Sequence, residues 1–543
     1  MPSTSCRAPA TSEASLRATL TSRTTSVFGW VTLCAVAGLV AAPVVVIVSS
    51  VIDPTPSMWS ELWQTRLPGM ITDTVTLLVA VVAGTLVLGT GLAWLVTAYD
   101  FPARRIVGWL LVTPLAVPGY VAGFVWLDTL AGPFGQRGVR SIWFCAATLV
   151  LTLYPYVYLF ARAAFRSQGA DSGDAARTLG LGPLRTFLRV SLPMARPALA
   201  AGGALVTMEV LTDVGTVRLF NVSTVADGVL RVWFSTGNRD AAAELATALV
   251  VTAVGLIVFE RGLRGSARYD TRATGRPMTA APLGVRGRAI ALATVATVLA
   301  VAVAAPVVRL ITWSVEAQRA GTTATMAGGL WHHASSTLVV AGFATVTCVV
   351  VGVGLAVLAR HRGGVGRIAT RVASLGYAMP GPVVAVGVVI TLAAFDRAGF
   401  VPGRFVFVGS VVGLVFALTV RFLAVGLQGI ESGLERVPPA AVASARTLGA
   451  RPTRVAWSVE LPAARSAIVA ATALLMIDLM KELPITLLLR PFGVDTLAVW
   501  VWQATSESLW AQAAVPSLAI VIVGMCAVGA LLAALERGAE VVS

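Results

Sequence analysis

Five charged residues lie in strongly apolar stretches, where ionisable groups are costly unless they face a cavity, a partner or a pathway. Glu209 and Asp213 form one set, and Asp478, Lys481 and Glu482 form the other. A shift of 269 positions places Glu209 on Asp478. The same shift places Asp213 on Glu482. Such groups could contact a charged solute, hold a gate closed or form a static ion cluster. Their symmetric recurrence favours a pore or gate, in which Lys481 would neutralise Glu482 or Asp213.

The elements that carry these charges are long apolar segments. The sequence is 57% hydrophobic and only 12% charged. Apolar runs of about 20 residues recur along it, and each is long enough to cross a bilayer as a helix. The pattern predicts an all-α polytopic membrane protein with about twelve transmembrane helices. The predicted spans are 27–50, 70–97, 106–131, 141–163, 195–216, 241–262, 289–313, 334–359, 368–396, 403–427, 463–489 and 511–535.

Basic residues predict the orientation of these spans. With the N-terminus inside, 28 of the 41 Lys and Arg residues lie in inner segments, ten in outer loops and three within spans. Inner loops carry the excess of Lys and Arg in membrane proteins. Both termini are therefore expected in the cytoplasm of a bacterial inner membrane. The formal net charge of +15 is mostly this topological bias, which argues against nucleic acid and leaves the lipid bilayer as the expected surrounding.

Composition and repetition also divide the chain. We expect a disordered cytoplasmic tail over 1–26, a first half over 27–262, a linker over 263–288 and a second half over 289–543. The linker is rich in Arg, Gly, Thr and Pro, which is typical of connecting segments. Because the 269-residue shift spans six crossings, the halves are expected to be parallel copies.

One polar segment occurs in both halves. It reads AARTLGLGPLRTFLRVSLP at 175–193 and SARTLGARPTRVAWSVELP at 444–462. Gly180 is placed to end a short helix in a left-handed cap. Gly182 and Pro183 suit the N-cap and first position of a second helix. Pro193 is expected to end that helix and to start the next span. The result is a helical elbow on the inner surface. It could touch lipid headgroups, but two copies favour docking of a two-fold symmetric partner.

This segment resembles the EAA loop of the membrane subunits of ABC importers. That motif runs EAA, three residues, Gly, nine residues, Ile, one residue, Leu-Pro. The loops span about 169–193 and 436–462. The resemblance implies two six-helix halves of the type I importer permease class, in a pseudo-two-fold arrangement. It also implies that each loop couples the permease to an ATP-hydrolysing subunit. The expected coupling residues are Asp174, Ala175, Ala176, Gly180, Pro183, Arg185, Leu192 and Pro193 in the first copy, and Ala445, Gly449, Pro452, Arg454, Leu461 and Pro462 in the second.

The rest of the chain resembles the fused ferric-iron-type permeases. KELPITLLLRPFGVDTLAVWVW (481–502) and TDVGTVRLFNVSTVADGVLRVWFS (212–235) carry this likeness. It implies ferric iron as cargo, delivered by an external solute-binding protein, with thiamine or another small anion or metal as alternatives. Two departures from the motif make the expected docking sites unequal: its Glu is replaced by the shorter Asp174 in the first copy and by Ala443 in the second.

The chain lacks a nucleotide-binding motif of its own. A P-loop needs GxxxxGK[ST], and the only lysine is Lys481, with no glycine-rich loop before it. The chain is thus expected to bind no cofactor, and the resemblance implies that ATP and Mg²⁺ bind on two partner ATPase subunits. A secondary transporter with proton-carrying carboxylates is the alternative class, although it would not need the repeated elbow. A membrane enzyme is disfavoured because no catalytic or metal-binding constellation is visible.

Aromatic and histidine residues add smaller expectations. Tyr154, Tyr156 and Tyr158 recur at every second position on one predicted span. Tyrosines in such spans mostly bond neighbouring helices, although their oxygens could touch a hard cation. His332 and His333 are expected in a solvated outer loop.

Overall fold

Helices make up almost all of the chain that the structure describes. This computed structural model describes residues 34–49, 60, 63–168, 178, 180–236, 239–264, 280–321, 329–374, 376, 379–399 and 406–540. The expected tail over 1–26 and residues 265–279 of the expected linker lie outside these ranges. Within them, one short parallel pair joins β1 (Tyr99–Asp100) to β2 (Ala281–Pro282). This pair ties the chain just before the second half to the loop that follows α3.

The first half contains five helices of more than 20 residues and several short ones. An unlabelled apolar helix, Cys34–Ser49, comes first. The other elements are α3 (Leu67–Ala98), α4 (Arg104–Leu110), η2 (Thr113–Ala116), α5 (Gly119–Val139), α6 (Ile142–Ser167), α8 (Pro183–Thr186), η3 (Phe187–Ser191), α9 (Leu192–Thr212), α10 (Gly215–Leu219), α11 (Val225–Thr236) and α12 (Arg239–Arg264).

The second half repeats this order. Its elements are α13 (Val285–Leu299), η4 (Ala300–Ala304), α14 (Ala305–Arg319), α15 (Gly329–Ala373), α16 (Gly381–Ala398), α17 (Val411–Glu435), α18 (Pro439–Thr447), α19 (Pro452–Val455), η7 (Ala456–Glu460), α20 (Leu461–Ala463), α21 (Arg465–Met480), α22 (Pro484–Leu489), α23 (Leu497–Ser506) and α24 (Trp510–Glu540).

The helices match the predicted spans in position. Among the described residues, seven helices are long and apolar enough to cross a membrane, and two bent pairs raise this number to nine. Two shorter apolar helices lie at Cys34–Ser49 and Ala241–Gly255. Each predicted span overlaps at least one of these helices or α9. The all-α polytopic architecture is therefore confirmed.

One predicted span, 106–131, is broken, and a second bend lies at the start of the predicted span 463–489. The pair Arg104–Ala116 and Gly119–Val139 bends by 87°, at Val117 and Pro118. The pair Pro452–Ala463 and Arg465–Met480 bends by 72°. Proline cannot donate a backbone hydrogen bond and disfavours helical geometry in the residue before it, so the first break is expected at Pro118.

The two halves exchange helices. The core of the second half takes in buried residues of α11 and α12, and that of the first half includes Val528 of α24. The Thr247 hydroxyl in α12 donates to the Ile47 carbonyl at 2.8 Å, and the helix containing Ile47 packs against Gly387 of α16. In the other half, Arg309 of α14 pairs with Asp128 of α5 at 3.0 Å. Each half is therefore stabilised by an N-terminal helix of the other.

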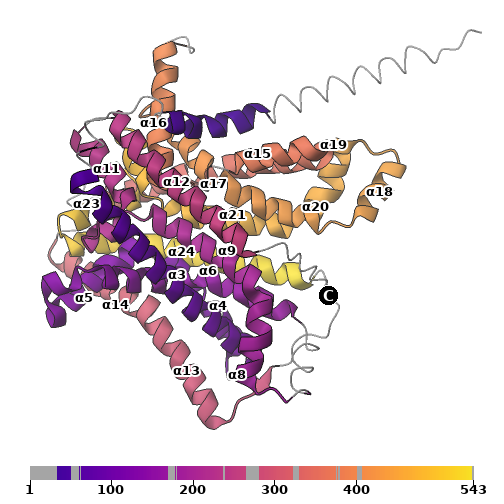
Figure 1. Cartoon of the computed structure of the whole chain (residues 1–543), viewed down its shortest axis with the longest axis horizontal. Coiled ribbons are helices and arrows are strands. Elements are labelled where there is room, and N and C mark those ends of the chain that lie inside the picture. Colours follow the sequence, from indigo (N-terminus) through magenta and orange to yellow (C-terminus); the bar gives the residue numbers. More distant parts are fainter. Residues whose placement is uncertain are drawn as a thin grey trace, which may run out of the picture.

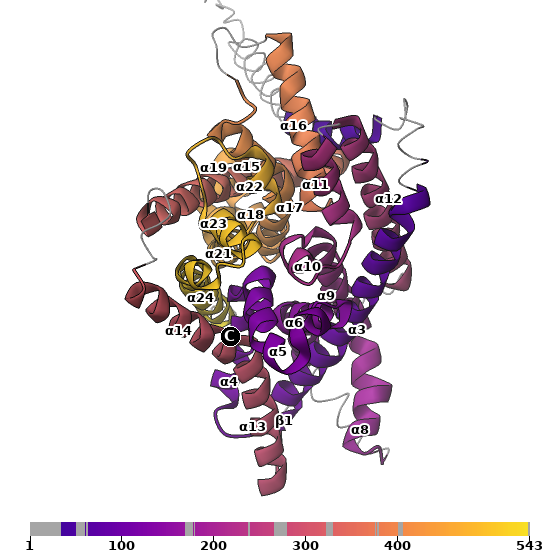
Figure 2. The same cartoon turned by 90° about the vertical axis from the view of Figure 1, so that its left-hand side faces the viewer.

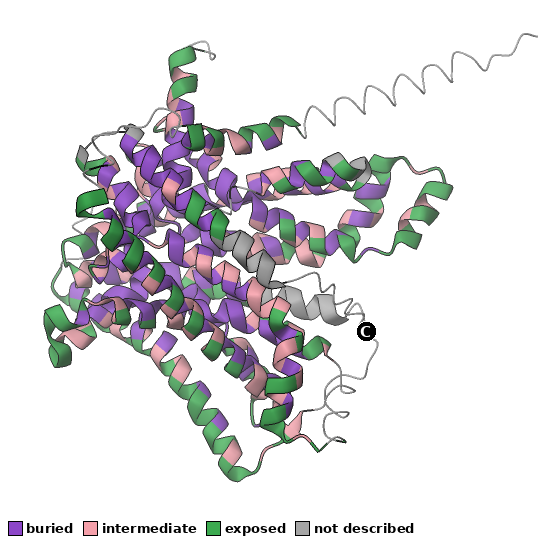
Figure 3. Cartoon of the chain, in the orientation of Figure 1, coloured by how far each residue is buried: buried purple, intermediate pink, exposed green. Residues whose placement is uncertain are grey.

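The repeated polar segments lie away from the end formed by α5, α11 and α23. Figure 1 shows these three helices toward its left, α18 and α19 toward its right, and α8 near its lower centre. Figure 2 looks onto that left-hand end, where α5, α10, α11 and α23 face the viewer. α18 contains no buried residue, and Figure 3 shows it as an exposed arm.

Candidate functional site

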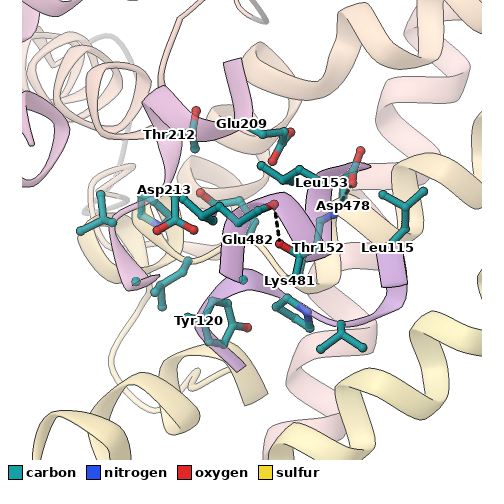
Figure 4. A pocket seen from close by; sticks show the side chains of 18 of the residues that line it. Leu115, Tyr120, Thr152, Leu153, Glu209, Thr212, Asp213, Asp478, Lys481 and Glu482 are labelled. Carbon is teal, nitrogen blue, oxygen red and sulfur yellow. Dashed lines mark hydrogen bonds and ion pairs between the residues drawn. The ribbon is translucent and has the colours of Figure 1, made fainter. Parts of the chain in front are cut away.

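A small cavity lies where the two halves meet, at the ends of α9 and α21. Its volume is about 90 Å³. All five intramembrane charges predicted as gate residues line it, and Figure 4 shows them together around the cavity. The structure thus brings into one place residues that are up to 273 positions apart in the sequence. These residues are Glu209, Asp213, Asp478, Lys481 and Glu482.

Asp213 caps the short helix that follows α9. The backbone turns extended at Asp213, with φ −67° and ψ 118°. Its carboxylate accepts hydrogen bonds from the Thr216 amide at 2.8 Å and the Thr216 hydroxyl at 2.7 Å. The Val217 amide donates to the same group at 3.3 Å. Because the first amides of a helix have no partner within it, Asp213 stabilises the start of α10 at the cavity wall.

Glu482 makes the equivalent cap in the second half. Its carboxylate accepts from the Ile485 amide at 2.8 Å, the Thr486 amide at 3.1 Å and the Thr486 hydroxyl at 3.0 Å. The capped amides lie three and four residues after the carboxylate in both halves. Residues related by the 269-residue shift therefore make equivalent hydrogen bonds. Both carboxylates therefore have a structural role in addition to lining the cavity.

The pairing expected for Lys481 is wrong. Its ammonium lies 2.9 Å from Asp478 Oδ1, one helical turn earlier on α21, rather than on Glu482 or Asp213. Glu482 instead pairs with Arg421 of α17, Nη1 to Oε1, at 3.4 Å. The reason is geometric. The Glu482 carboxylate turns toward the amides of α22, where Arg421 reaches it, whereas Lys481 follows the last turn of α21 and meets Asp478.

Arg421 is the cavity residue that sequence reasoning missed. It was visible as an arginine within a predicted span, but its counterpart under the 269-residue shift is the uncharged Thr152, so symmetry gave no signal. Its side chain is 7% exposed. With Arg421 included, four carboxylates and two cationic side chains line the cavity. Its lining is therefore acidic on balance when all six groups are ionised.

The tyrosines divide between packing and the cavity. Tyr158 donates to the Gly108 carbonyl at 2.9 Å, as expected for a bond to a neighbouring helix. Tyr156 approaches Asp478 across the boundary between the halves, with 3.5 Å between its hydroxyl and Oδ1. The Tyr154 hydroxyl is buried and has no hydrogen-bond partner among the described residues.

His333 departs from the expectation of a solvated loop. It belongs to α15 and is 4% exposed, with its ring 4.7 Å from that of Trp500. Its Nδ1 lies 3.0 Å from the Asp495 carbonyl, and His332 Nε2 lies 3.1 Å from the Gly493 carbonyl. These contacts anchor the loop between α22 and α23. Among the described residues, no group of three or more His, Cys, Asp or Glu could hold a metal ion.

The second polar segment has a well-formed helix end. After α18, the Gly449 amide donates to the Arg446 carbonyl and the Ala450 amide to the Ala445 carbonyl. Gly449 has φ +82°, and the two bonds form a Schellman motif. Gly180 has φ +76°, which confirms its expected left-handed conformation. Asp174, Ala175 and Ala176 lie outside the described residues.

Both segments then continue through a π-turn. Pro183 begins α8 after an extended Gly182, as expected, and Pro452 begins α19. The π-turns η3 and η7 occupy equivalent positions, and each is closed by a bond from the residue five positions on, Leu192 or Leu461.

Pro193 lies in the first turn of α9 and so starts the next span as expected, but it does not end the helix before it, because η3 leads directly into α9. The wider π-turn changes the bonding pattern just before the residue that cannot donate, so the helix continues. In the second half the helix passes Pro462 and ends at Ala464.

Large apolar side chains are exposed on these segments. Leu188 is 51% exposed, and its counterpart Trp457 is 74% exposed. Leu184 and Leu448 are exposed as well. Phe187, three residues after Leu184, instead packs on Trp94, with 4.9 Å between the ring centres. Arg185 and Arg454 are exposed beside these residues. The segments therefore present an apolar and basic surface, which is the kind of patch that marks an interaction site.

Comparison with known proteins covers most of the chain. The family described as "Binding-protein-dependent transport system inner membrane component" matches residues 85–261 and 349–540. The chain is 24% identical over 469 residues to the Fe(3+)-transport system permease protein FbpB 2 of Haemophilus influenzae, which covers 85% of this chain and 89% of that protein.

Shorter matches reach permeases with other named solutes. The sulfate transport system permease protein CysT of Escherichia coli is 32% identical over 176 residues, covering 29% of this chain and 62% of that protein. The molybdate/tungstate transport system permease protein WtpB of Thermococcus kodakarensis is 27% identical over 197 residues, covering 36% of this chain and 76% of that protein.

Proposed function

The chain belongs to the family of binding-protein-dependent transport system inner membrane components, and from this premise we propose that it moves ferric iron inward as the permease of an ATP-driven importer. The acidic cavity between the halves is the observation that carries the proposal, because its carboxylates outnumber its cationic side chains. Carboxylate oxygens attract hard cations. The long match to a ferric permease supports this cargo over the sulfate and molybdate of the shorter matches.

Two ATPase subunits bind the repeated segments in this proposal. The exposed Leu188 and Trp457, at equivalent positions, support one docking site on each half. These subunits hold ATP and Mg²⁺, and the chain itself binds no cofactor. An external solute-binding protein delivers cargo to the opposite end, where α5, α10, α11 and α23 lie. The segments then face the cytoplasm, as do both termini.

The cavity works as a gate in this cycle. Asp213 and Glu482 fix the starts of α10 and α22, so movement of either half shifts a carboxylate and a short helix together. The Lys481–Asp478 and Arg421–Glu482 pairs hold the charged lining while cargo is absent. ATP binding draws the coupling segments together, and the halves rock to open the cavity outward, which is alternating access between two states.

Reconstitution tests the proposal directly. The full chain is placed in proteoliposomes with its partner ATPase and binding protein, and uptake of radioactive iron is measured with and without ATP. We expect uptake that needs ATP and the iron-loaded binding protein. Iron uptake that does not depend on ATP but is abolished by a protonophore would indicate a secondary transporter that uses the intramembrane carboxylates. Uptake of sulfate, molybdate or thiamine in place of iron would support the proposal of an ATP-driven importer but contradict the proposal that its cargo is iron.

A further inference from the structure

A second pocket lies beside the central cavity, at the end of the molecule away from the repeated segments. It has a volume of about 210 Å³ and is bounded by α5, α10, α23 and the start of α24. Tyr120 and Gly215 line both this pocket and the central cavity. A solute bound here would therefore be one residue layer from the acidic gate.

The charge of this outer pocket is opposite to that of the cavity. Arg140 and Arg218 line it, and no acidic residue does among the described residues. Arg218 is held in place by Asp227, a fully buried carboxylate that accepts from its Nε. Arg231 donates to the other oxygen of Asp227 at 2.5 Å. Two arginines thus share one carboxylate, and the region keeps an excess of positive charge.

Arg218 is prepared to bind a further group. Its Nε is used by Asp227, and its terminal nitrogens make no hydrogen bond to any described residue. The guanidinium carbon lies 5.9 Å from the centre of the Trp502 ring. Its side chain is 24% exposed, so solvent or a solute can reach it. A planar guanidinium held in this way is suited to oxygens of a carboxylate or phosphate-like anion.

Tyr120 supplies an unused donor at the inner wall. The residue is 7% exposed, and its hydroxyl has no hydrogen-bond partner within the described chain. A buried hydroxyl without a partner is costly. Because Tyr120 lines both the outer pocket and the central cavity, an anion bound at the wall between them would accept from this hydroxyl. Ser508 adds a hydroxyl at the rim. The Thr505 and Ser506 hydroxyls already donate to the Trp502 carbonyl, at 3.1 and 2.7 Å, and are not counted as donors.

We propose that this outer pocket binds a small oxyanion or carboxylate through Arg140, Arg218 and Tyr120. The pocket has room for such an anion with water, since a liquid water occupies about 30 Å³. This inference rests on the proposed function, because a trivalent cation gathers anionic oxygen ligands and reaches the permease with them. The pocket takes the anion while the cation meets the acidic cavity behind Tyr120, which separates the two before the gate.

Direct anion binding tests this proposal independently of transport. The full chain with its ATPase subunits is placed in nanodiscs of zwitterionic lipid, and binding of radioactive phosphate, sulfate and citrate is measured. Zwitterionic lipid excludes anionic headgroups as the occupant. We expect saturable binding that Arg140→Gln weakens about tenfold or more, the loss of one charge-assisted hydrogen bond. Tyr120→Phe should weaken it several-fold. Arg137→Gln, a neighbouring exposed arginine outside the pocket, should leave it unchanged.

Two outcomes would overturn the inference. One is the absence of saturable binding of all three anions to the correctly inserted wild-type complex. The other is binding that neither Arg140→Gln nor Tyr120→Phe weakens. In the second case, weaker docking of the binding protein to the Arg140→Gln variant would show that this arginine contacts a protein instead of an anion. Iron uptake measured in parallel separates the proposals, since uptake without anion binding rejects only this inference and anion binding without uptake rejects only the importer.

Discussion

Asp213 and Glu482 make the same helix cap in the two halves of one chain, each accepting hydrogen bonds from the amides three and four residues further on. Each carboxylate therefore both begins a short helix and lines the cavity. This double use means that removing a side chain and removing its charge are different experiments. A substitution that keeps the cap but loses the charge isolates the role in transport.

Asp213→Asn should preserve the fold and lower transport. Asparagine caps helices about as well as aspartate, whereas alanine costs about 1 kcal/mol. We expect Asp213→Asn to unfold at close to the wild-type temperature and Asp213→Ala to be less stable. Iron uptake should fall in Asp213→Asn and in Glu482→Gln, because the acidic lining is reduced. Wild-type uptake rates in both variants, inserted normally, would refute a role for these charges in the gate.

Arg421→Gln should destabilise the protein more than the change of a surface arginine. The substitution leaves the Glu482 charge buried without its cationic partner, and breaking a buried pair costs about 3–5 kcal/mol. The double variant Arg421→Gln with Glu482→Gln should recover part of that loss. Thermal unfolding of the two single variants and the double variant gives the coupling energy. The exposed Arg397→Gln serves as the control, and purely additive effects would show that the pair contributes nothing.

The sequence could predict this cavity only in part. Apolar flanks and the 269-residue shift identified Glu209, Asp213, Asp478 and Glu482, because charges within spans are rare and these recur. The shift could not identify Arg421, whose counterpart is Thr152. The partner of Lys481 depends on where α21 ends and how Glu482 turns toward α22, which are tertiary features.

The repeated segments likewise combine features that the sequence predicts with features that only the structure shows. Gly180 and Gly449 were recognisable because a left-handed helix end favours glycine. The continuation of the helix through Pro193 could not be recognised from the sequence, because the π-turn before it is visible only in backbone hydrogen bonds. The exposure of Trp457 and the inward turn of Phe187 also required the packed structure.

Gly449→Ala should weaken the coupling segment, whereas Gly182→Ala should not. Gly449 has φ +82°, where a Cβ costs about 1–2 kcal/mol. Gly182 has φ −68°, and neither glycine has an atom within 4 Å of an added Cβ. The comparison therefore isolates backbone conformation from crowding. Cargo-stimulated ATP hydrolysis by the reconstituted complex is the measurement, and equal rates in the two variants would contradict the argument.

Trp457→Ala should impair assembly with the ATPase. The ring is 74% exposed on the second polar segment, and truncation of a buried interface tryptophan commonly costs about 2 kcal/mol or more. That cost corresponds to about a thirtyfold loss of affinity. Trp331, 81% exposed on α15 beside the His332 contact to Gly493, provides the control. Co-purification of the ATPase should drop with Trp457→Ala and persist with Trp331→Ala; loss in both would point to general instability.

The two docking sites should respond unequally to changes at their acidic positions. The first segment carries Asp174 and the second carries Ala443. An acid here can pair with a basic residue of the ATPase. Removing one partner of a charge pair that is buried in an interface weakens binding strongly, because the other charge stays buried and unpaired, whereas an interface that never formed the pair has no such penalty. Asp174→Ala should therefore reduce cargo-stimulated ATP hydrolysis more than Ala443→Glu alters it. Equal and negligible effects would mean that the apolar side chains and the Gly and Pro framework, including Trp457 and Gly449, dock the ATPase without this charge.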